Sequence, residues 1–253
     1  HSLSLPLSFA DQQAAAPGGA VAAVIHLFYP ELAVEFRSYL QNIPGRVDLF
    51  LSACDATAES QIRNAFAGWE KGLIDVRLVA NRGRDIAPKL VAFRDVYDQY
   101  ELVLHLHSKK STHASVLYSW RHHLLQNLVG SSDVVASVFH AFRVNPRLGM
   151  VAAAHFEPVR HWINWGTNFD LARGLACRMG LQLDRDSVLD FPSGSMFWAR
   201  SAALRPLLDL ELAVKDFPAE EAQIDGTIAH AIERLYFFVC EKAGYAWIKV
   251  AQS

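Results

Sequence analysis

Apolar runs alternate with amphipathic segments through the amino-terminal half of the chain. Four largely apolar runs predict buried strands, at residues 21–29, 47–52, 74–79 and 102–107. The segments between them predict helices, at residues 31–41, 58–71 and 88–97. This alternation is typical of a doubly wound parallel sheet with right-handed crossovers. We therefore expect an α/β fold with a mostly parallel, Rossmann-type sheet and helices on both faces.

The carboxy-terminal half has a less regular pattern. It predicts helices at 117–129 and 132–145, an apolar stretch at 149–154, a loop rich in Trp, Asn and Gly at 161–168, a helix from Ser201 and a long amphipathic helix from Gly226 to about Lys242. Residues 1–19 have no sustained period, so we expect a flexible tail there. No linker interrupts the rest, and residues 20–253 are predicted to be one domain.

Composition limits the classes of protein that need consideration. The chain has 253 residues, of which 51% are hydrophobic and 20% charged, which is typical of a globular protein. Lys and Arg number 24 against 26 Asp and Glu, so the net charge of -2 argues against nucleic acid as a partner. Any basic site must therefore be local.

Cysteines and apolar runs bear on the compartment. Cys54, Cys177 and Cys240 are odd in number and far apart, which favours a reducing compartment over a disulfide framework or a zinc site. The longest apolar run, 20–29, is about half the roughly 20 residues that a membrane-spanning helix needs. The chain begins at His1, so we expect a domain of a longer protein.

A basic cluster follows the third predicted strand. Asn81-Arg82-Gly83-Arg84-Asp85 combines two guanidinium groups with a glycine, an amide and a carboxylate. Arginine suits phosphate, glycine lets backbone N–H groups approach an anion, and Asp or Asn can bind ribose hydroxyls. Ligands of open α/β sheets bind at the carboxyl ends of the strands, where this cluster is predicted to lie. A solvated turn with an internal Arg/Asp pair is the alternative.

A second cluster follows the fourth predicted strand. His105 and His107 alternate with leucine and therefore project from one face, and Lys109 and Lys110 come directly after them. Two histidines can bind a metal, but the lysines would repel a cation, so a diphosphate is the better ligand. Alternatively, His105 is a core residue and the lysines lie in a solvated turn.

Two further segments carry candidate chemistry. In residues 191–198, a Gly194-Ser195 turn can expose backbone donors to a polyol, and it can equally be a plain turn before a core strand. Asp225 precedes the last long helix, where Asp is a standard N-cap, although Gly226 leaves room for a ligand beside the carboxylate. His230 and Glu233 share the polar side of that helix and suit an exposed pair.

Together these clusters resemble the rhamnan synthesis protein F family of bacterial polysaccharide glycosyltransferases. The resemblance extends from about residue 22 to residue 245 and rests on five stretches in the family's order: residues 81–85, 105–111, Trp120-Arg121 with Leu124-Leu125 and Asn127-Leu128, residues 194–200, and Asp225-Gly226-Thr227 followed by residues 230–234.

The resemblance implies a GT-A-type glycosyltransferase with a nucleotide-binding amino-terminal half and an acceptor-binding carboxy-terminal half. It implies dTDP-L-rhamnose as donor and a polysaccharide or lipid-linked oligosaccharide as acceptor. Other glycosyltransferase domains would belong to the longer chain, in the cytoplasm or at the inner face of the membrane. Many GT-A enzymes hold a divalent metal with an Asp-x-Asp motif, where this chain has His105-Leu106-His107 and the two lysines. We therefore expect no metal cofactor, because ammonium groups can neutralise the leaving diphosphate.

The resemblance also assigns roles to single residues. It implies an inverting single displacement with Asp225 as base. It places at the donor Asn81, Arg82, Gly83, Arg84, Asp85, His105, His107, Lys109 and Lys110. It places at the sugar or acceptor Gly194, Ser195, Met196, Trp120, Arg121 and His230.

Two other classes of function compete with this one. A degenerate transferase fold can bind a nucleotide or glycan without turnover, and binding without product formation would identify it. A Rossmann NAD enzyme needs a G-x-G-x-x-G turn after the first strand, where this chain has Tyr29-Pro30-Glu31. The sequence therefore favours a transferase over a dehydrogenase.

Overall fold

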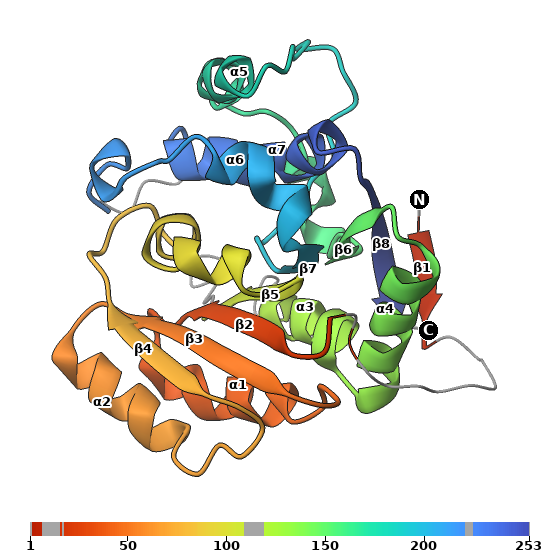
Figure 1. The fold of residues 1–253 in the computed structure, drawn as a ribbon. Coiled ribbons are helices and arrows are strands. Elements are labelled where there is room, and N and C mark those ends of the chain that lie inside the picture. The colour runs from red at the N-terminus through yellow and green to blue at the C-terminus, as the bar shows by residue number, and fades with distance from the viewer. Residues whose placement is uncertain (1, 7–15, 17, 109–118, 221–224, 253) are drawn as a thin grey trace.

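One mixed sheet forms the centre of the protein (Figure 1). The computed structural model describes residues 2–6, 16, 18–108, 119–220 and 225–252. Its eight strands lie in the order β1-β8-β6-β7-β5-β2-β3-β4. Their bounds are β1 Ser2–Leu5, β2 Val21–His26, β3 Val47–Ala53, β4 Ile74–Leu78, β5 Leu102–His107, β6 Leu148–Ala153, β7 Phe197–Arg200 and β8 Ala246–Gln252. Strand β7 is antiparallel to β5 and β6, and the other neighbouring strands are parallel, so the sheet is mostly parallel as predicted.

The predicted strands of the amino-terminal half form one side of this sheet. β3 and β4 lie on one side of β2 and β5 lies on the other, which is the strand order of a Rossmann-type half. The order changes direction between β2 and β5. In open α/β sheets this switch point, at the carboxyl ends of the strands, is where ligands bind.

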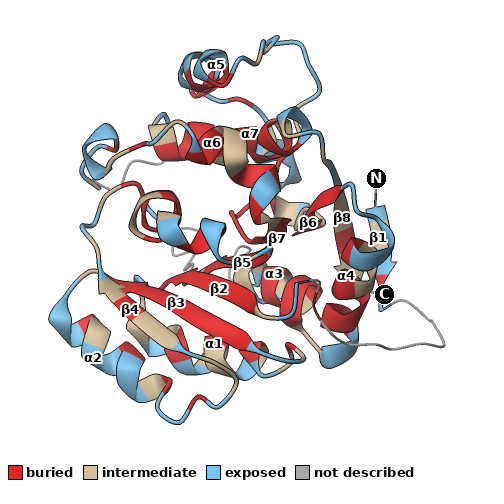
Figure 2. Ribbon diagram, viewed as in Figure 1, coloured by how far each residue is buried: buried red, intermediate tan, exposed pale blue. Residues whose placement is uncertain are grey.

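Helices cover both faces of the sheet (Figure 1). The side chains of β2 alternate between two core clusters, with Val21, Ala23 and Ile25 in one and Ala22 and Val24 in the other. The first cluster includes residues of α1 Ala33–Leu40, α2 Ala56–Ala65, α3 Trp120–Val129 and α4 Ser132–Val144. The second includes residues of α5 Phe169–Arg178, α6 Arg205–Leu208 and α7 Ile228–Lys242. Figure 2 shows the central strands buried on both sides, which explains their continuous apolar sequences.

Several elements differ from the sequence prediction. Helix α5 and strand β8 were not expected, and α2 is shorter than the helix expected at 58–71. The helix expected at 88–97 is a π-helical turn, Pro88–Ala92, followed by a 3₁₀ helix, Arg94–Asp98. The helix expected from Ser201 begins as the 3₁₀ helix Ser201–Leu204 and continues as α6. Four residues of the expected flexible tail form strand β1 instead, because Ser2–Leu5 pair in parallel with β8 at the edge of the sheet. Residues 7–15 and 17 lie outside the described residues.

Candidate active site

A cavity of about 430 Å³ lies at the carboxyl ends of β2 and β5, at the switch point of the sheet. Residues from six separate stretches of the chain line it: His26, Phe28, Tyr29, Asn81, Arg84, Asp85, Ile86, His107, Ser108, Gly194, Ser195, Glu220, Ala229, His230 and Glu233. Among the predicted site residues it brings together Asn81, Arg84, Asp85, His107, Gly194, Ser195 and His230. Polar groups from both halves of the chain therefore share one space.

The turn that follows β4 forms the first wall. Its backbone is left-handed at Gly83 (φ 65°) and Arg84 (φ 56°). A Cβ at Gly83 would lie 2.4 Å from Phe217 Cδ1, so only glycine fits there without displacing the ring. Arg82 donates from Nη1 to the carbonyl of Phe217 at 3.1 Å, and Arg84 Nε lies 3.6 Å from Glu220 Oε1. Arg82 and Gly83 thus shape the turn, while Arg84 lines the cavity.

Asp85 ends this turn and is paired with a lysine that we did not predict as a site residue. Lys89 is fully buried, and its Nζ lies 2.7 Å from Asp85 Oδ2. Burial alone would raise the pKa of Asp85, but the charges of His107 and Lys89 and the Lys89 hydrogen bond outweigh it and lower the pKa. The carboxyl group is therefore ionised at neutral pH. This pair joins the turn to the short helix at Pro88–Ala92.

Histidines at the two strand ends have different environments. His107 lines the cavity, and its Nε2 lies 2.7 Å from the carbonyl oxygen of Gly194, to which it donates. His105 is completely buried, and the hydroxyl of Tyr97 lies 2.7 Å from its Nε2. The expectation that His105 contacts the donor therefore fails, because an inward position on a strand buried on both faces places its ring in the core. His26, at the end of β2, also lines the cavity, and burial lowers its pKa to about 4.

The turn before β7 forms the opposite wall. Gly194 has a φ of 90° and Ser195 a φ of 55°. The Gly194 N–H donates to Glu233 Oε1 at 2.8 Å. A Cβ at Gly194 would lie 2.7 Å from Leu124 Cδ1 and 3.3 Å from Trp120 Cζ2, so α3 packs directly beneath this turn. The glycine is required both by its backbone conformation and by this close contact.

Helix α7 contributes residues to the same side of the cavity. His230 is 6% exposed and Glu233 is half-buried, and both line the cavity, so the expectation of an exposed pair is wrong. Both residues are withdrawn from solvent because α7 packs against α5 as well as against the sheet. Thr227 Oγ1 lies 2.8 Å from His230 Nδ1, and burial together with the charge of Arg84 lowers the His230 pKa to about 4. His230 is therefore neutral at pH 7.

Asp225 lies beside the cavity without lining it in the described part of the chain. Its Oδ1 accepts from Asn168 Nδ2 at 2.6 Å, and its Oδ2 accepts from the backbone N–H of Thr167 at 3.2 Å. Burial would raise its pKa, but these hydrogen bonds and the charge of Arg234, 3.3 Å away, lower it. The N-cap of α7 is Thr227, so the alternative reading of Asp225 as the N-cap is wrong. Its carboxylate instead ties the 164–168 loop to the start of α7.

The remaining predicted site residues fall elsewhere. Met196 is fully buried in the core, because the chain turns inward there as it enters β7. Trp120 packs against Gly194 from below, and Arg121 Nη2 forms an ion pair with Glu35 Oε2 at 3.0 Å. Arg121 therefore joins α3 to α1 instead of lining the cavity. Lys109 and Lys110 lie outside the described residues.

Several cavity residues carried no sequence signal strong enough to select them. They are His26, Phe28, Tyr29, Ser108, Glu220 and Glu233. Ser108 Oγ accepts from the backbone N–H of Tyr29 at 2.8 Å, which joins the ends of β2 and β5. The one available signal was position, since Phe28 and Tyr29 end the first predicted strand and Ser108 directly follows the fourth, at the strand ends where ligands bind.

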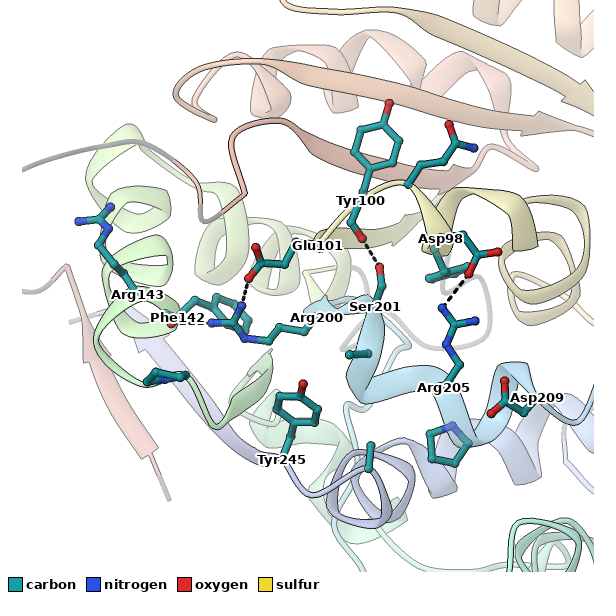
Figure 3. Close-up of a pocket in the computed structure, with 16 residues that line it drawn as sticks. Asp98, Tyr100, Glu101, Phe142, Arg143, Arg200, Ser201, Arg205, Asp209 and Tyr245 are labelled. Atoms are coloured by element: carbon teal, nitrogen blue, oxygen red, sulfur yellow. Dashed lines mark hydrogen bonds and ion pairs between the residues drawn. The ribbon is translucent and has the colours of Figure 1, made fainter.

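A larger cavity, of about 980 Å³, lies at the other end of the central strands, next to the amino end of β5 (Figure 3). Tyr100 and Glu101 precede β5 there, Arg200 ends the antiparallel β7, and Ser201 follows it. Its polar groups bind one another, as Arg205 Nη2 does with Asp98 Oδ1 at 2.8 Å and Ser201 Oγ with the Tyr100 carbonyl at 2.6 Å. Because these groups are mutually satisfied and lie at the amino end of β5, the smaller cavity is the candidate active site.

The described residues set two further limits. They include no helix that is both long and apolar enough to cross a bilayer. They also include no cluster of three or more His, Cys, Asp or Glu side chains arranged to bind a metal ion.

Comparison with known proteins identifies the family. A sequence profile described as rhamnan synthesis protein F matches residues 6–245, nearly the whole chain. The chain belongs to the rhamnan synthesis protein F family. Two proteins called uncharacterized protein WxcX, from two strains of Xanthomonas campestris pv. campestris, are each 45% identical over 175 residues, which is 68% of this chain and 25% of theirs. This family member thus matches about a quarter of the length of these relatives. The family description indicates a role in polysaccharide synthesis.

Proposed function

We propose that this family member is a GT-A-type glycosyltransferase that transfers L-rhamnose from dTDP-L-rhamnose to a growing bacterial surface polysaccharide, an O-antigen or rhamnan. The main support is the cavity at the switch point, where the basic turn at 81–85 faces the Gly194-Ser195 turn and α7. A nucleotide sugar needs both a cationic group for its diphosphate and polar groups for its sugar hydroxyls, and the cavity has Arg84 for the first and polar side chains of both turns and of α7 for the second. Family membership supports the polysaccharide as product.

The first wall is suited to the nucleoside diphosphate. Arg84 and Asn81 line the cavity, and the Arg84 side chain is 40% exposed, so a phosphate oxygen can reach it. A guanidinium pairs with phosphate through two parallel hydrogen bonds, which is stronger than its 3.6 Å contact with Glu220. In this proposal Lys109 and Lys110 also neutralise the leaving diphosphate, as the family resemblance implies, and no metal cofactor is needed.

The reaction is an inverting single displacement. Asp225 removes the proton from an acceptor hydroxyl, whose oxygen forms a bond with the anomeric carbon of the donor sugar. The bond from that carbon to the diphosphate breaks at the same time, and its electron pair leaves with dTDP. Asp225 is ionised and can accept the proton, and its lowered pKa makes it a weaker base than a free carboxylate. His230, whose pKa is lowered to about 4, is a neutral side chain at pH 7. The acceptor is a polysaccharide or lipid-linked oligosaccharide at the inner face of the membrane.

The test is dTDP release from dTDP-L-rhamnose in the presence of a rhamnosyl oligosaccharide, with UDP- and GDP-sugars in parallel and each reaction repeated in EDTA. We expect turnover with dTDP-L-rhamnose and no loss of rate in EDTA. Arg84→Gln should weaken dTDP binding about 10- to 100-fold, since a hydrogen bond between charged groups contributes about 1.5–3 kcal/mol. The matched control is Arg173→Gln on the exposed side of α5, which should leave affinity unchanged.

Other results would change the proposal in defined ways. Binding of dTDP without turnover of any donor would support a non-catalytic nucleotide-binding module. Loss of activity in EDTA would exclude the metal-independent mechanism. Faster turnover of a UDP- or GDP-sugar would show that dTDP-L-rhamnose is not the donor.

A further inference from the structure

Lys89 is the feature of this cavity that the proposed mechanism leaves unexplained. Lysine is rarely buried unless it is paired, yet Lys89 is 0% exposed. Its Nζ donates to Asp85 Oδ2 at 2.7 Å and to the backbone carbonyl of Ser195 at 2.8 Å. These two partners belong to opposite walls of the cavity and are more than 100 residues apart in sequence. One ammonium group therefore joins the two walls.

The first consequence concerns Asp85. Lys89 occupies Oδ2, whereas the other oxygen, Oδ1, has no hydrogen bond within the described residues and lies 4.0 Å from His107 Nε2. Asp85 lines the cavity and is ionised, and an ionised carboxylate can only accept hydrogen bonds. Lys89 thus holds an acceptor in a fixed orientation where a ligand with a hydroxyl group can donate to it.

The second consequence concerns Ser195. Its carbonyl is fixed by Lys89, its backbone has a φ of 55°, and it is 3% exposed. Its Oγ is buried without a hydrogen-bond partner among the described residues, and so is His230 Nε2. Both residues line the cavity that Asp85 lines. Buried polar atoms without a partner are costly, at about 1–3 kcal/mol each, so two of them in one cavity indicate a polar ligand.

Hydroxyl groups match this set of atoms. Each can donate one hydrogen bond and accept others, so neighbouring hydroxyls on one ring can serve a carboxylate, a serine and an imidazole together. A diphosphate cannot do so, because it is negatively charged and would face Asp85. The hydroxyl-bearing part of the donor therefore lies at Asp85, Ser195 and His230, and the diphosphate lies toward Arg84.

We propose that Asp85 Oδ1, Ser195 Oγ and His230 Nε2 form the subsite for the hydroxyl groups of the transferred sugar, and that Lys89 is the positioning residue that holds Asp85 and Ser195 in place. This inference rests on the proposed function, since it assigns one part of a nucleotide sugar to one part of the cavity. It separates the sugar from the nucleotide in a way that binding measurements can resolve.

The experiment compares the affinities for dTDP-L-rhamnose and for dTDP by titration calorimetry. In Lys89→Met we expect affinity for dTDP-L-rhamnose to fall about 10- to 100-fold and affinity for dTDP to change less than about threefold, because only the sugar contacts Asp85. Lys242→Met is the matched control, since Lys242 is an exposed lysine at the end of α7 that binds the Gly180 carbonyl at 3.0 Å. It should leave both affinities unchanged.

A second variant, Ser195→Ala, tests the subsite even if Lys89→Met does not fold. Ser195→Ala removes a hydroxyl that has no partner among the described residues, so the fold should keep its stability in urea while affinity for dTDP-L-rhamnose falls about three- to tenfold. Ser187→Ala, in an exposed loop, is its control. A purely structural role for this turn predicts no such difference between the two ligands.

The outcomes distinguish the two proposals. Failure of the wild-type protein to bind either ligand would overturn the proposed function and this subsite with it. Binding of both ligands by the wild type, with the same ratio of affinities in folded Lys89→Met and in Ser195→Ala, would overturn the subsite alone. Loss of dTDP affinity equal to the loss of dTDP-L-rhamnose affinity would place Asp85 and Ser195 at the nucleotide instead of the sugar.

Discussion

Two carboxylates near the cavity differ in ways that bear on which of them is the base. Asp225 accepts hydrogen bonds at both oxygens and lies beside the cavity, whereas Glu233 lines it and binds the Gly194 N–H. We expect Asp225→Asn to lower kcat about 10²- to 10⁴-fold with little change in KM, because a general base acts in the transition state. Glu233→Gln should lower kcat less, since its amide oxygen can still accept from Gly194. Initial rates of dTDP release measure both.

The control for these variants is Asp186→Asn, which removes a carboxylate from an exposed loop and should not change the rate. If Glu233→Gln abolishes turnover while Asp225→Asn remains active, Glu233 is the base and Asp225 serves to hold the 164–168 loop. Circular dichroism of each variant separates loss of the base from loss of the fold.

The sequence predicted which segments contribute to the site better than it predicted where each side chain points. The cluster at 81–85 was correctly placed at a strand end, but only the structure shows that Arg82 turns toward Phe217 while Arg84 turns toward the cavity. That distinction depends on a contact 135 residues away in sequence, which no local pattern encodes. Lys89 had a weak signal, an i+4 spacing from Asp85 within apolar residues.

A substitution at Gly194 measures how much the turn before β7 contributes to stability and to donor binding. Gly194→Ala would place a Cβ 2.7 Å from Leu124 and force alanine into a φ of 90°, so we expect a loss of about 1–3 kcal/mol in the free energy of unfolding and a loss of donor binding. Gly174→Ala is the matched control, because Gly174 lies within α5 with nothing within 4 Å of the added Cβ. It should raise stability by up to about 1 kcal/mol. Urea unfolding monitored by circular dichroism measures both.

Equal stability of the wild type and Gly194→Ala would mean that the turn relaxes freely, against the packing described above. Loss of stability without loss of donor binding would separate the turn's structural role from a role at the site. Donor affinity should therefore be measured in both glycine variants under conditions where they are folded.

Elements with a continuous apolar sequence were predictable, and those stabilised by distant contacts were not. Strand β5 was predicted with its observed bounds, because polar segments on both sides of these six residues mark where the strand begins and ends. Every residue of strand β8 except Val250 is exposed or partly exposed, so its sequence lacks the apolar pattern of a buried strand, and its place is set by pairing with β6 and β1. The segment after Pro88 departs from a regular helix where Lys89 turns inward to Asp85 and Ser195.

The protein as a whole has a net charge of -2, yet its cavity has positive side chains concentrated in and behind one wall. The predicted anion site required local positive charge, and the described residues place Arg84 at one wall and the buried Lys89 behind it. Three histidines near these charges have lowered pKa values, to about 4 for His26 and His230 and well below 6.5 for His105. Burial is the largest cause for each, and Lys89 or Arg84 adds to it. The cavity thus contains neutral histidines beside fixed charges.

These histidines predict how the stability of the whole protein depends on pH. In the unfolded chain each takes up a proton near pH 6.5, whereas in the folded protein they stay neutral until about pH 4. Between these values the unfolded state binds more protons, so the free energy of unfolding falls as the pH falls, by up to about 1.4 kcal/mol per pH unit for each histidine. The low pKa of Asp85 acts only below this window.

Urea unfolding at a series of pH values between about 7.5 and 4.5 measures this slope. His26→Gln should reduce the slope, because it removes one group that titrates only on unfolding, although loss of its hydrogen bond to Ser52 Oγ lowers stability at neutral pH. His161→Gln, at an exposed position, should leave the slope unchanged. A wild-type stability that stays constant from about pH 7 to pH 5 would show that the buried histidines take up protons in the folded state, which would require water or an anion beside them in the cavity.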